Sequence, residues 1–254
     1  MGSWNRDRPA HLSGDTAAFE LVRPILEGES FRPRYAGQCL RDIREALCFS
    51  SDVPKATDSA VRKRAFGVVE LIIKSITARM NHMIHEIDVN DRDETWQENF
   101  QELARLVDHI SNQLYFSSGA FDGTNSHKKL EEEARRRFWE ESQQVILQLS
   151  NVAIPSAAHH LIETLQSFIP FKPIAVFHSI AAVVRSAKSW GYQYESLAVD
   201  LLVNITENYI AEHRIELQKD RQSREELIDI LETFVEAGWP SARRLSYRLE
   251  EIFR

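Results

Sequence analysis

The chain has 254 residues, enough for one large domain or two small ones with a sizeable buried core. Its 31 Lys and Arg against 38 Asp and Glu leave a formal net charge of −7, which argues against general affinity for nucleic acid or anionic membranes. Only 9 Gly and 8 Pro occur, too few for an all-β chain with many turns. The sequence therefore predicts a nearly all-helical protein, with about two-thirds of its residues or more in helices.

The start of the chain is polar and lacks the apolar core of a secretory signal. We predict a disordered tail over residues 1–14, in which Met1-Gly2-Ser3 resembles the remnant of an expression tag. A bundle of long helices is expected over residues 15–118, beginning with short helices near 15–26 and 34–49.

No proline occurs between Pro54 and Pro155, and such a gap permits long uninterrupted helices. Apolar residues recur there at steps of three and four. This pattern predicts three helices, over residues 58–87, 93–116 and 126–151. The loop over residues 119–125, which contains two glycines, is the expected boundary between two halves.

The second half, residues 126–254, continues with shorter helices that Pro or Gly introduces. Short connections make consecutive helices antiparallel, in an array that we expect to pack on the first half. After the helix over 126–151, the expected helices cover residues 156–169, 173–190, 193–219, 223–237 and 240–253. Leu201 is expected at the centre of the apolar stripe of the longest of these, so that Leu201→Asp would destabilise this half severely.

Helical pairs of this size, joined by tight turns, resemble HEAT or armadillo repeats over residues 156–254. The resemblance implies a solenoid-like second half beside a long-helix bundle. A closed helical bundle is the alternative architecture, because no strict repeat consensus is present.

The segments Gly191–Ala198 and Ala237–Arg244 resemble the extreme C-terminus of large multidomain bacterial proteins that carry NTPase domains. Some of those proteins belong to antiphage defence. The resemblance implies that the chain is the C-terminal region of a larger bacterial protein. No G-x-x-x-x-G-K-[ST] motif occurs in this sequence, so no nucleotide site is carried over.

The segment Arg79–His85 fits the Arg-x(4–6)-His spacing and resembles HEPN-type ribonucleases, which are also helical. The resemblance implies metal-independent RNA cleavage, with Arg79 holding the phosphate and His85 acting as acid or base. The alternative is a packed helix, because Met80, Met83 and Ile84 suit a buried face.

One further set of side chains has the spacing of metal ligands. His159 and Glu163 share a helical face, His160 is adjacent, and His178 is the nearest candidate for a further ligand. A structural role in helix packing is the alternative, and we predict neither a metal nor another cofactor.

Two charged segments favour structural interpretations. Residues 88–93 begin like an EF-hand loop but lack the required Gly and Glu, so we expect Asp91 or Asp93 to cap the next helix. The block 128–141 places Glu four residues before Arg three times, which is typical of a solvated helix face.

Aromatic and basic residues gather at two loops of the second half. Alternate loops of an antiparallel array share an edge, and Trp, Tyr and Arg are enriched at interaction hot spots. The candidate partner-binding residues are Trp190, Tyr192, Tyr194, Trp239, Arg243 and Arg244. The alternative is that the aromatic rings seal the ends of the helical layers.

These observations favour a non-catalytic helical interaction or scaffold module that binds a protein partner or other domains of a larger chain. We expect a cytoplasmic location, because the two cysteines are too far apart along a predicted helix for a disulfide and no apolar run is long enough to span a membrane. The alternative is the ribonuclease that uses Arg79 and His85. Nucleic-acid binding is otherwise not expected, given the negative net charge.

Overall fold

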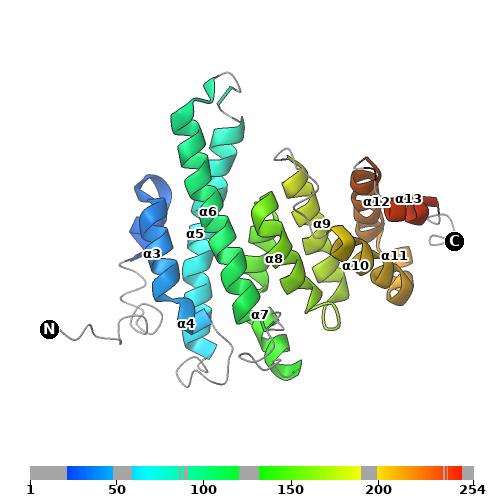
Figure 1. Cartoon of the computed structure of the whole chain (residues 1–254). Helices are drawn as coiled ribbons and strands as arrows, with labels where there is room; N and C mark the ends of the chain where they lie inside the picture. Colours follow the sequence, from blue (N-terminus) through cyan, green and yellow to red (C-terminus); the bar gives the residue numbers. More distant parts are fainter. Residues whose placement is uncertain are drawn as a thin grey trace. The chain divides into compact units, whose positions relative to one another are not determined.

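The computed structural model describes residues 22–47, 59–85, 87–88, 91–119, 132–189, 199–236, 238 and 240–247 (Figure 1). These residues are 87% helical and include no strand, which confirms the predicted all-α fold. Among the same residues, no helix combines the length and the apolar character that crossing a membrane requires.

The chain divides into two compact units, unit 1 up to Leu149 and unit 2 from Ser150 onward. The division differs from the one expected at residues 119–125. The helix after that loop packs on the first long helix, through Phe66 and Phe138, whose rings meet edge to face at 5.5 Å. Its apolar face is therefore buried within unit 1.

Residues 22–26 of unit 1 are helical, and a 3-10 turn and five further helices follow in its described part. They are η1 (Gly28–Ser30), α3 (Pro33–Asp42), α4 (Arg44–Leu47), α5 (Ser59–His85), α6 (Glu94–Ser117) and α7 (Glu132–Ser150). The predicted helices over 58–87 and 93–116 correspond to α5 and α6 within two residues at each end. The long helix α5 contacts α3, α4 and α6, and therefore forms the centre of the unit. Its fully or almost fully buried residues include Ala65, Val68, Val69, Ile72, Ile73, Ile76 and Met80.

The single helix expected over residues 34–49 is interrupted in the structure. Ile43 has φ −93° and ψ −1°, and it separates α3 from α4. The change of direction buries both Ile43 and Leu47, at 0% and 1% exposure, and α4 contacts α5. In α3, Cys39 is half-buried, and burial raises the pKa of its thiol.

A buried ion pair joins α5 and α7. The Arg62 guanidinium donates from Nε to Glu141 Oε2 at 2.7 Å and from Nη2 to Oε1 at 3.3 Å. Only 4% of the Arg62 side chain and 6% of the Glu141 side chain are exposed. Both charges are therefore removed from water, and their mutual contact offsets part of the cost of burying them.

Unit 2 contains six helices in its described part. They are α8 (Pro155–Gln166), α9 (Pro173–Ser189), α10 (Val199–Glu212), α11 (Arg214–Lys219), α12 (Arg221–Glu236) and α13 (Pro240–Tyr247). Pro155, Pro173 and Pro240 each occupy the first helical position, where the missing N–H costs no hydrogen bond. These prolines explain why the predicted starts of α8, α9 and α13 fall within one residue of the observed ones.

The prediction of one helix over residues 193–219 is wrong in its C-terminal part. A break at His213 divides it into α10 and α11. The break lets α11 pack against both α10 and α12 and buries Leu217 completely. Neither Pro nor Gly marks this position, so the break follows from tertiary packing.

The predicted apolar stripe of α10 differs from the structure at Leu201. Leu201 is partly exposed, whereas Leu202 is 0% exposed. Ile205 and Tyr209 continue the buried stripe, and the Tyr209 ring stacks on Phe177 of α9 with 4.2 Å between ring centroids. The core position at this level of unit 2 is therefore Leu202.

Several Ser and Thr hydroxyls in the helices donate to the carbonyl oxygen four residues earlier in the same helix. The distances lie between 2.7 and 3.0 Å. The donors are Thr77, Ser142, Thr164, Ser179 and Thr233. Four of them, all except Thr77, are buried, and the local hydrogen bond compensates each for lost water.

Candidate functional site

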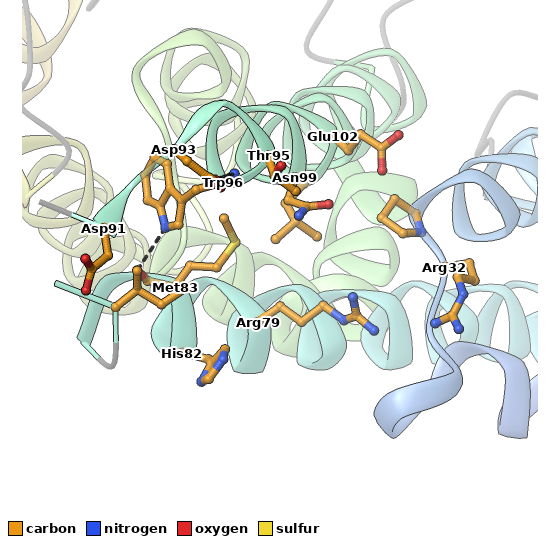
Figure 2. Close-up of a pocket in the computed structure, with 13 residues that line it drawn as sticks. Arg32, Arg79, His82, Met83, Asp91, Asp93, Thr95, Trp96, Asn99 and Glu102 are labelled. Atoms are coloured by element: carbon orange, nitrogen blue, oxygen red, sulfur yellow. Dashed lines mark hydrogen bonds between the residues drawn. The ribbon is translucent and has the colours of Figure 1, made fainter. Parts of the chain in front are cut away.

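A groove of about 610 Å³ lies in unit 1 between α5 and α6 (Figure 2). Arg79 and Met83 line it from α5, Trp96 and Asn99 line it from α6, and Arg32 closes one end. The predicted catalytic candidate Arg79 therefore lies at a cavity on the protein surface.

Arg79 itself is tied to the turn that precedes α3. Its Nη2 donates to the carbonyl oxygen of Phe31 at 2.9 Å and to that of Glu29 at 3.4 Å. The guanidinium also lies 5.2 Å from the centre of the Phe31 ring, a cation–π contact. Because Phe31 is fully buried, these contacts fasten the start of α3 to α5.

The second ribonuclease candidate, His85, is the last residue of α5, and its side chain lies outside what the structure describes. The histidine that lines the groove with Arg79 is His82, three residues away on the same side of the helix. Catalysis by Arg79 and His85 stays a prediction. The sequence motif did not single out His82. The signal that could have found it is its spacing of three residues from Arg79, which places both side chains on one side of a helix.

The turn before α6 performs the capping role predicted for it. Asp93 Oδ1 accepts a hydrogen bond from the Trp96 N–H at 2.8 Å, which confirms Asp93 as the N-cap. Trp96 Nε1 donates to the Met83 carbonyl at 3.1 Å. The guanidinium of Arg92 lies 4.8 Å from the Trp96 ring centre. These contacts hold α5 and α6 together at this end of the groove.

The predicted partner-binding residues are only partly described. Trp190, Tyr192, Tyr194 and Trp239 lie outside the described residues, so their common edge stays a prediction. Arg243 and Arg244 are both exposed on α13. A neighbour on the same helix was not among the predicted residues.

That neighbour is Tyr247, which is 85% exposed, the highest value among the large hydrophobic residues exposed in the described part of the chain. It follows Arg243 by four residues and Arg244 by three, so the three side chains share one face of α13. We call these three residues the α13 face. The spacing was the signal that could have found Tyr247.

The residues considered as metal ligands form hydrogen bonds and ion pairs instead. His159 Nε2 lies 3.3 Å from Glu163 Oε2, while His178 Nδ1 lies 2.5 Å from Glu226 Oε2. Within the described part of the chain, no group of three or more His, Cys, Asp or Glu side chains is arranged to hold a metal ion.

His178 of α9 lies between two carboxylates at the start of α12. Besides its contact with Glu226, its Nε2 is 3.8 Å from Asp220 Oδ2. The hydrogen bond to Glu226 raises the pKa of His178, and the Asp220 charge acts in the same direction, whereas burial opposes both. Glu226 is only 6% exposed, so protonated His178 compensates a buried carboxylate.

We expect unit 2 to lose stability when the pH rises above neutrality. The pKa of His178 is higher in the folded state than its unfolded value near 6.5, so the stabilisation is complete below that value and disappears as the pH passes the folded pKa. The test measures the melting temperatures of the parent chain and of His178→Gln between pH 5 and pH 9. The difference between the two at each pH reports the contribution of His178.

The difference removes the contribution of other titrating groups, such as His109 of unit 1, whose pKa burial lowers. The advantage of the parent over His178→Gln should be largest at pH 5 to 6 and shrink at alkaline pH. A difference that stays constant across the range would contradict the assignment.

We compared the chain with protein-family models, curated proteins and solved structures, and none of them matches it. The all-α fold class is therefore assigned from the helices of the structure alone. The resemblances to HEAT or armadillo repeats, to HEPN-type ribonucleases and to bacterial defence proteins stay predictions.

Proposed function

We propose that the chain is a non-catalytic helical interaction module that binds a protein partner, or another domain of a larger protein, through the α13 face. The main observation in support is the exposure of Tyr247. This large aromatic side chain is 85% exposed and lies beside two exposed arginines. Tyr and Arg are enriched among the residues that dominate binding energy, because each combines a large contact area with directed hydrogen bonds.

Charge supports a partner with an acidic surface. Neither Arg243 nor Arg244 forms an ion pair with a carboxylate among the residues described, so their guanidinium groups remain available to a partner. Carboxylates bind guanidinium groups with two parallel hydrogen bonds. Burying Tyr247 against such a surface would add apolar contact area at the centre of the interface.

The packing of unit 2 supports a scaffold role for the other helices. The helix α9 contacts α12, and α10 contacts α13, in addition to the contacts between α8 and α9 and between α12 and α13. Contacts between helices three positions apart in the chain, as well as between consecutive helices, join the helices of unit 2 into one packed array. Such an array would present the α13 face on a rigid support.

A photo-crosslinking amino acid at position 247 tests the proposal in the cells that naturally produce the protein. We expect a defined crosslinked partner with acidic surface residues, and we expect Arg243→Glu combined with Arg244→Glu to abolish the crosslink without changing the melting temperature. Tyr35 of α3, which is 59% exposed, provides the matched control position in unit 1.

The result distinguishes recognition from a structural role. An equally strong crosslink to the same partner from position 35, or a crosslink that survives the double charge reversal, would contradict binding through the α13 face. A large drop in melting temperature for the arginine variants would show that these side chains stabilise unit 2 instead.

A further inference from the structure

We propose that Arg32 and Arg79 form a binding site for the phosphate group of a small ligand in the groove of unit 1. The site is independent of the α13 face. It rests on how the structure holds the two guanidinium groups and on the distribution of charge along the groove.

The two arginines are anchored on the same pair of main-chain oxygens. Arg32 Nη1 donates to the carbonyl oxygens of Glu29 and Phe31, both at 2.9 Å, and Arg79 Nη2 donates to the same two oxygens at 3.4 and 2.9 Å. The two positive charges are therefore held side by side, and Figure 2 shows both side chains at one end of the groove. The carbonyl oxygens carry only partial charges, so the repulsion between the guanidinium groups is not fully offset.

Each arginine keeps donors for a ligand. One terminal nitrogen of each is used on the carbonyl oxygens, while Nε and the other terminal nitrogen have no hydrogen-bond partner within the described residues. Arg32 is exposed and Arg79 is half-buried, so these donors are accessible from the groove. A phosphate group, with up to two negative charges and several acceptor oxygens, matches two guanidinium groups in charge and in hydrogen bonding.

The remaining lining restricts the ligand. Asp91 and Asp93 lie at the opposite end of the groove from the arginines (Figure 2). Glu102 also lines the groove, on the side of Arg32 and Arg79 in Figure 2, and no ion pair joins it to either arginine within the described residues. A continuing chain of phosphates would meet repulsion from the aspartates. The geometry therefore favours a small ligand with a single phosphate group over a nucleic-acid strand.

The groove also offers uncharged contacts to the rest of such a ligand. Thr95 and Asn99 line it from α6 and supply a hydroxyl and an amide. Met83 and Leu103 form apolar lining, with 8% and 2% exposure. A small ligand held at its phosphate by the arginines would place its body against these residues.

The test is isothermal titration calorimetry of the full chain with inorganic phosphate at constant ionic strength. We expect saturable binding that Arg32→Gln weakens about tenfold or more, because the variant loses charge-assisted hydrogen bonds. Arg34→Gln, which removes an exposed arginine two residues away that does not line the groove, should bind like the parent.

Arg79→Gln should weaken binding similarly, but this variant also loses contacts to the turn before α3. For that reason the decisive variant is Arg32→Gln, whose substitution lies at an exposed position. Circular dichroism verifies that this variant is folded. Absence of saturable phosphate binding to the parent, or equal affinity of the parent and Arg32→Gln, would overturn the site. Equal weakening by Arg34→Gln would also overturn it, since that result indicates nonspecific charge attraction.

A second titration uses a short oligouridylate. Weaker binding than that of inorganic phosphate, or none, supports the restriction to a small ligand. Binding that is much tighter and depends on Arg32 would overturn that restriction and indicate a nucleic-acid site instead.

Discussion

Glu141→Gln is expected to lower the free energy of unfolding of unit 1 by about 3–5 kcal/mol. The substitution keeps the size and shape of the side chain but removes its charge. Arg62 then remains as a buried cation, with 4% of its side chain exposed, that has lost its charge-assisted hydrogen bonds to the Glu141 carboxylate. Denaturant titration followed by circular dichroism and fluorescence measures the loss.

Two further variants show that burial of the charge causes this effect. Glu133→Gln, on the same helix α7, removes the partner of Arg137 from a pair whose side chains are 64% and 61% exposed. It should change stability by less than about 0.5 kcal/mol, because solvent screens exposed pairs. The double variant Arg62→Met with Glu141→Leu should recover most of the stability. A loss of less than about 1 kcal/mol for Glu141→Gln would mean that water reaches Arg62.

Leu202→Asp is expected to unfold unit 2 or to leave it barely stable. Leu202 is 0% exposed in α10, and an unpaired carboxylate there costs several kcal/mol, which is comparable to the whole stability of a small domain. The helical signal of this variant in circular dichroism should fall. Part of the signal should remain, because unit 1 does not contain the substitution and stays folded.

Leu201→Asp is the matched control, since it makes the same chemical change one residue earlier. The Leu201 side chain is partly exposed. An aspartate introduced there can keep its carboxylate in water, so the loss of stability should be much smaller. If Leu201→Asp proved as damaging as Leu202→Asp, the buried stripe of α10 would include Leu201, contrary to the structure.

The helices themselves were predictable because their signals are local. The proline-free stretch and the recurrence of apolar residues gave α5 and α6, and prolines marked the starts of α8, α9 and α13. The breaks at Ile43 and His213 were not predictable, because neither position carries a helix-breaking residue and tertiary packing decides the direction of the chain.

The error at α10 has a specific cause. Leu201, Leu202 and Val203 are consecutive apolar residues, so periodicity alone allows the inward stripe to pass through any of them. Packing against Phe177, through Tyr209, selects the face that contains Leu202. A stripe with polar residues on both sides would have been assigned without this ambiguity.

Only one of the two arginines in the groove of unit 1 could be predicted from the sequence. A motif pointed to Arg79, but its neighbour Arg32 lies 47 positions earlier and meets it through shared main-chain carbonyl oxygens. The buried pair of Arg62 and Glu141 spans 79 positions. Such contacts depend on how the helices pack, and a single sequence offers no local pattern for them.

The hydroxyl groups that bond within their own helices have a consequence for how the sequence can vary. Because each hydroxyl donates to a carbonyl oxygen that is also available to a helical N–H, replacing Ser142 or Ser179 by alanine leaves no buried donor stranded in a neighbouring helix. Interior alcohols at these positions therefore impose no polar matching between adjacent helices. Mutational drift can pass through such positions without coordinated change elsewhere, whereas Arg62 and Glu141 must change together.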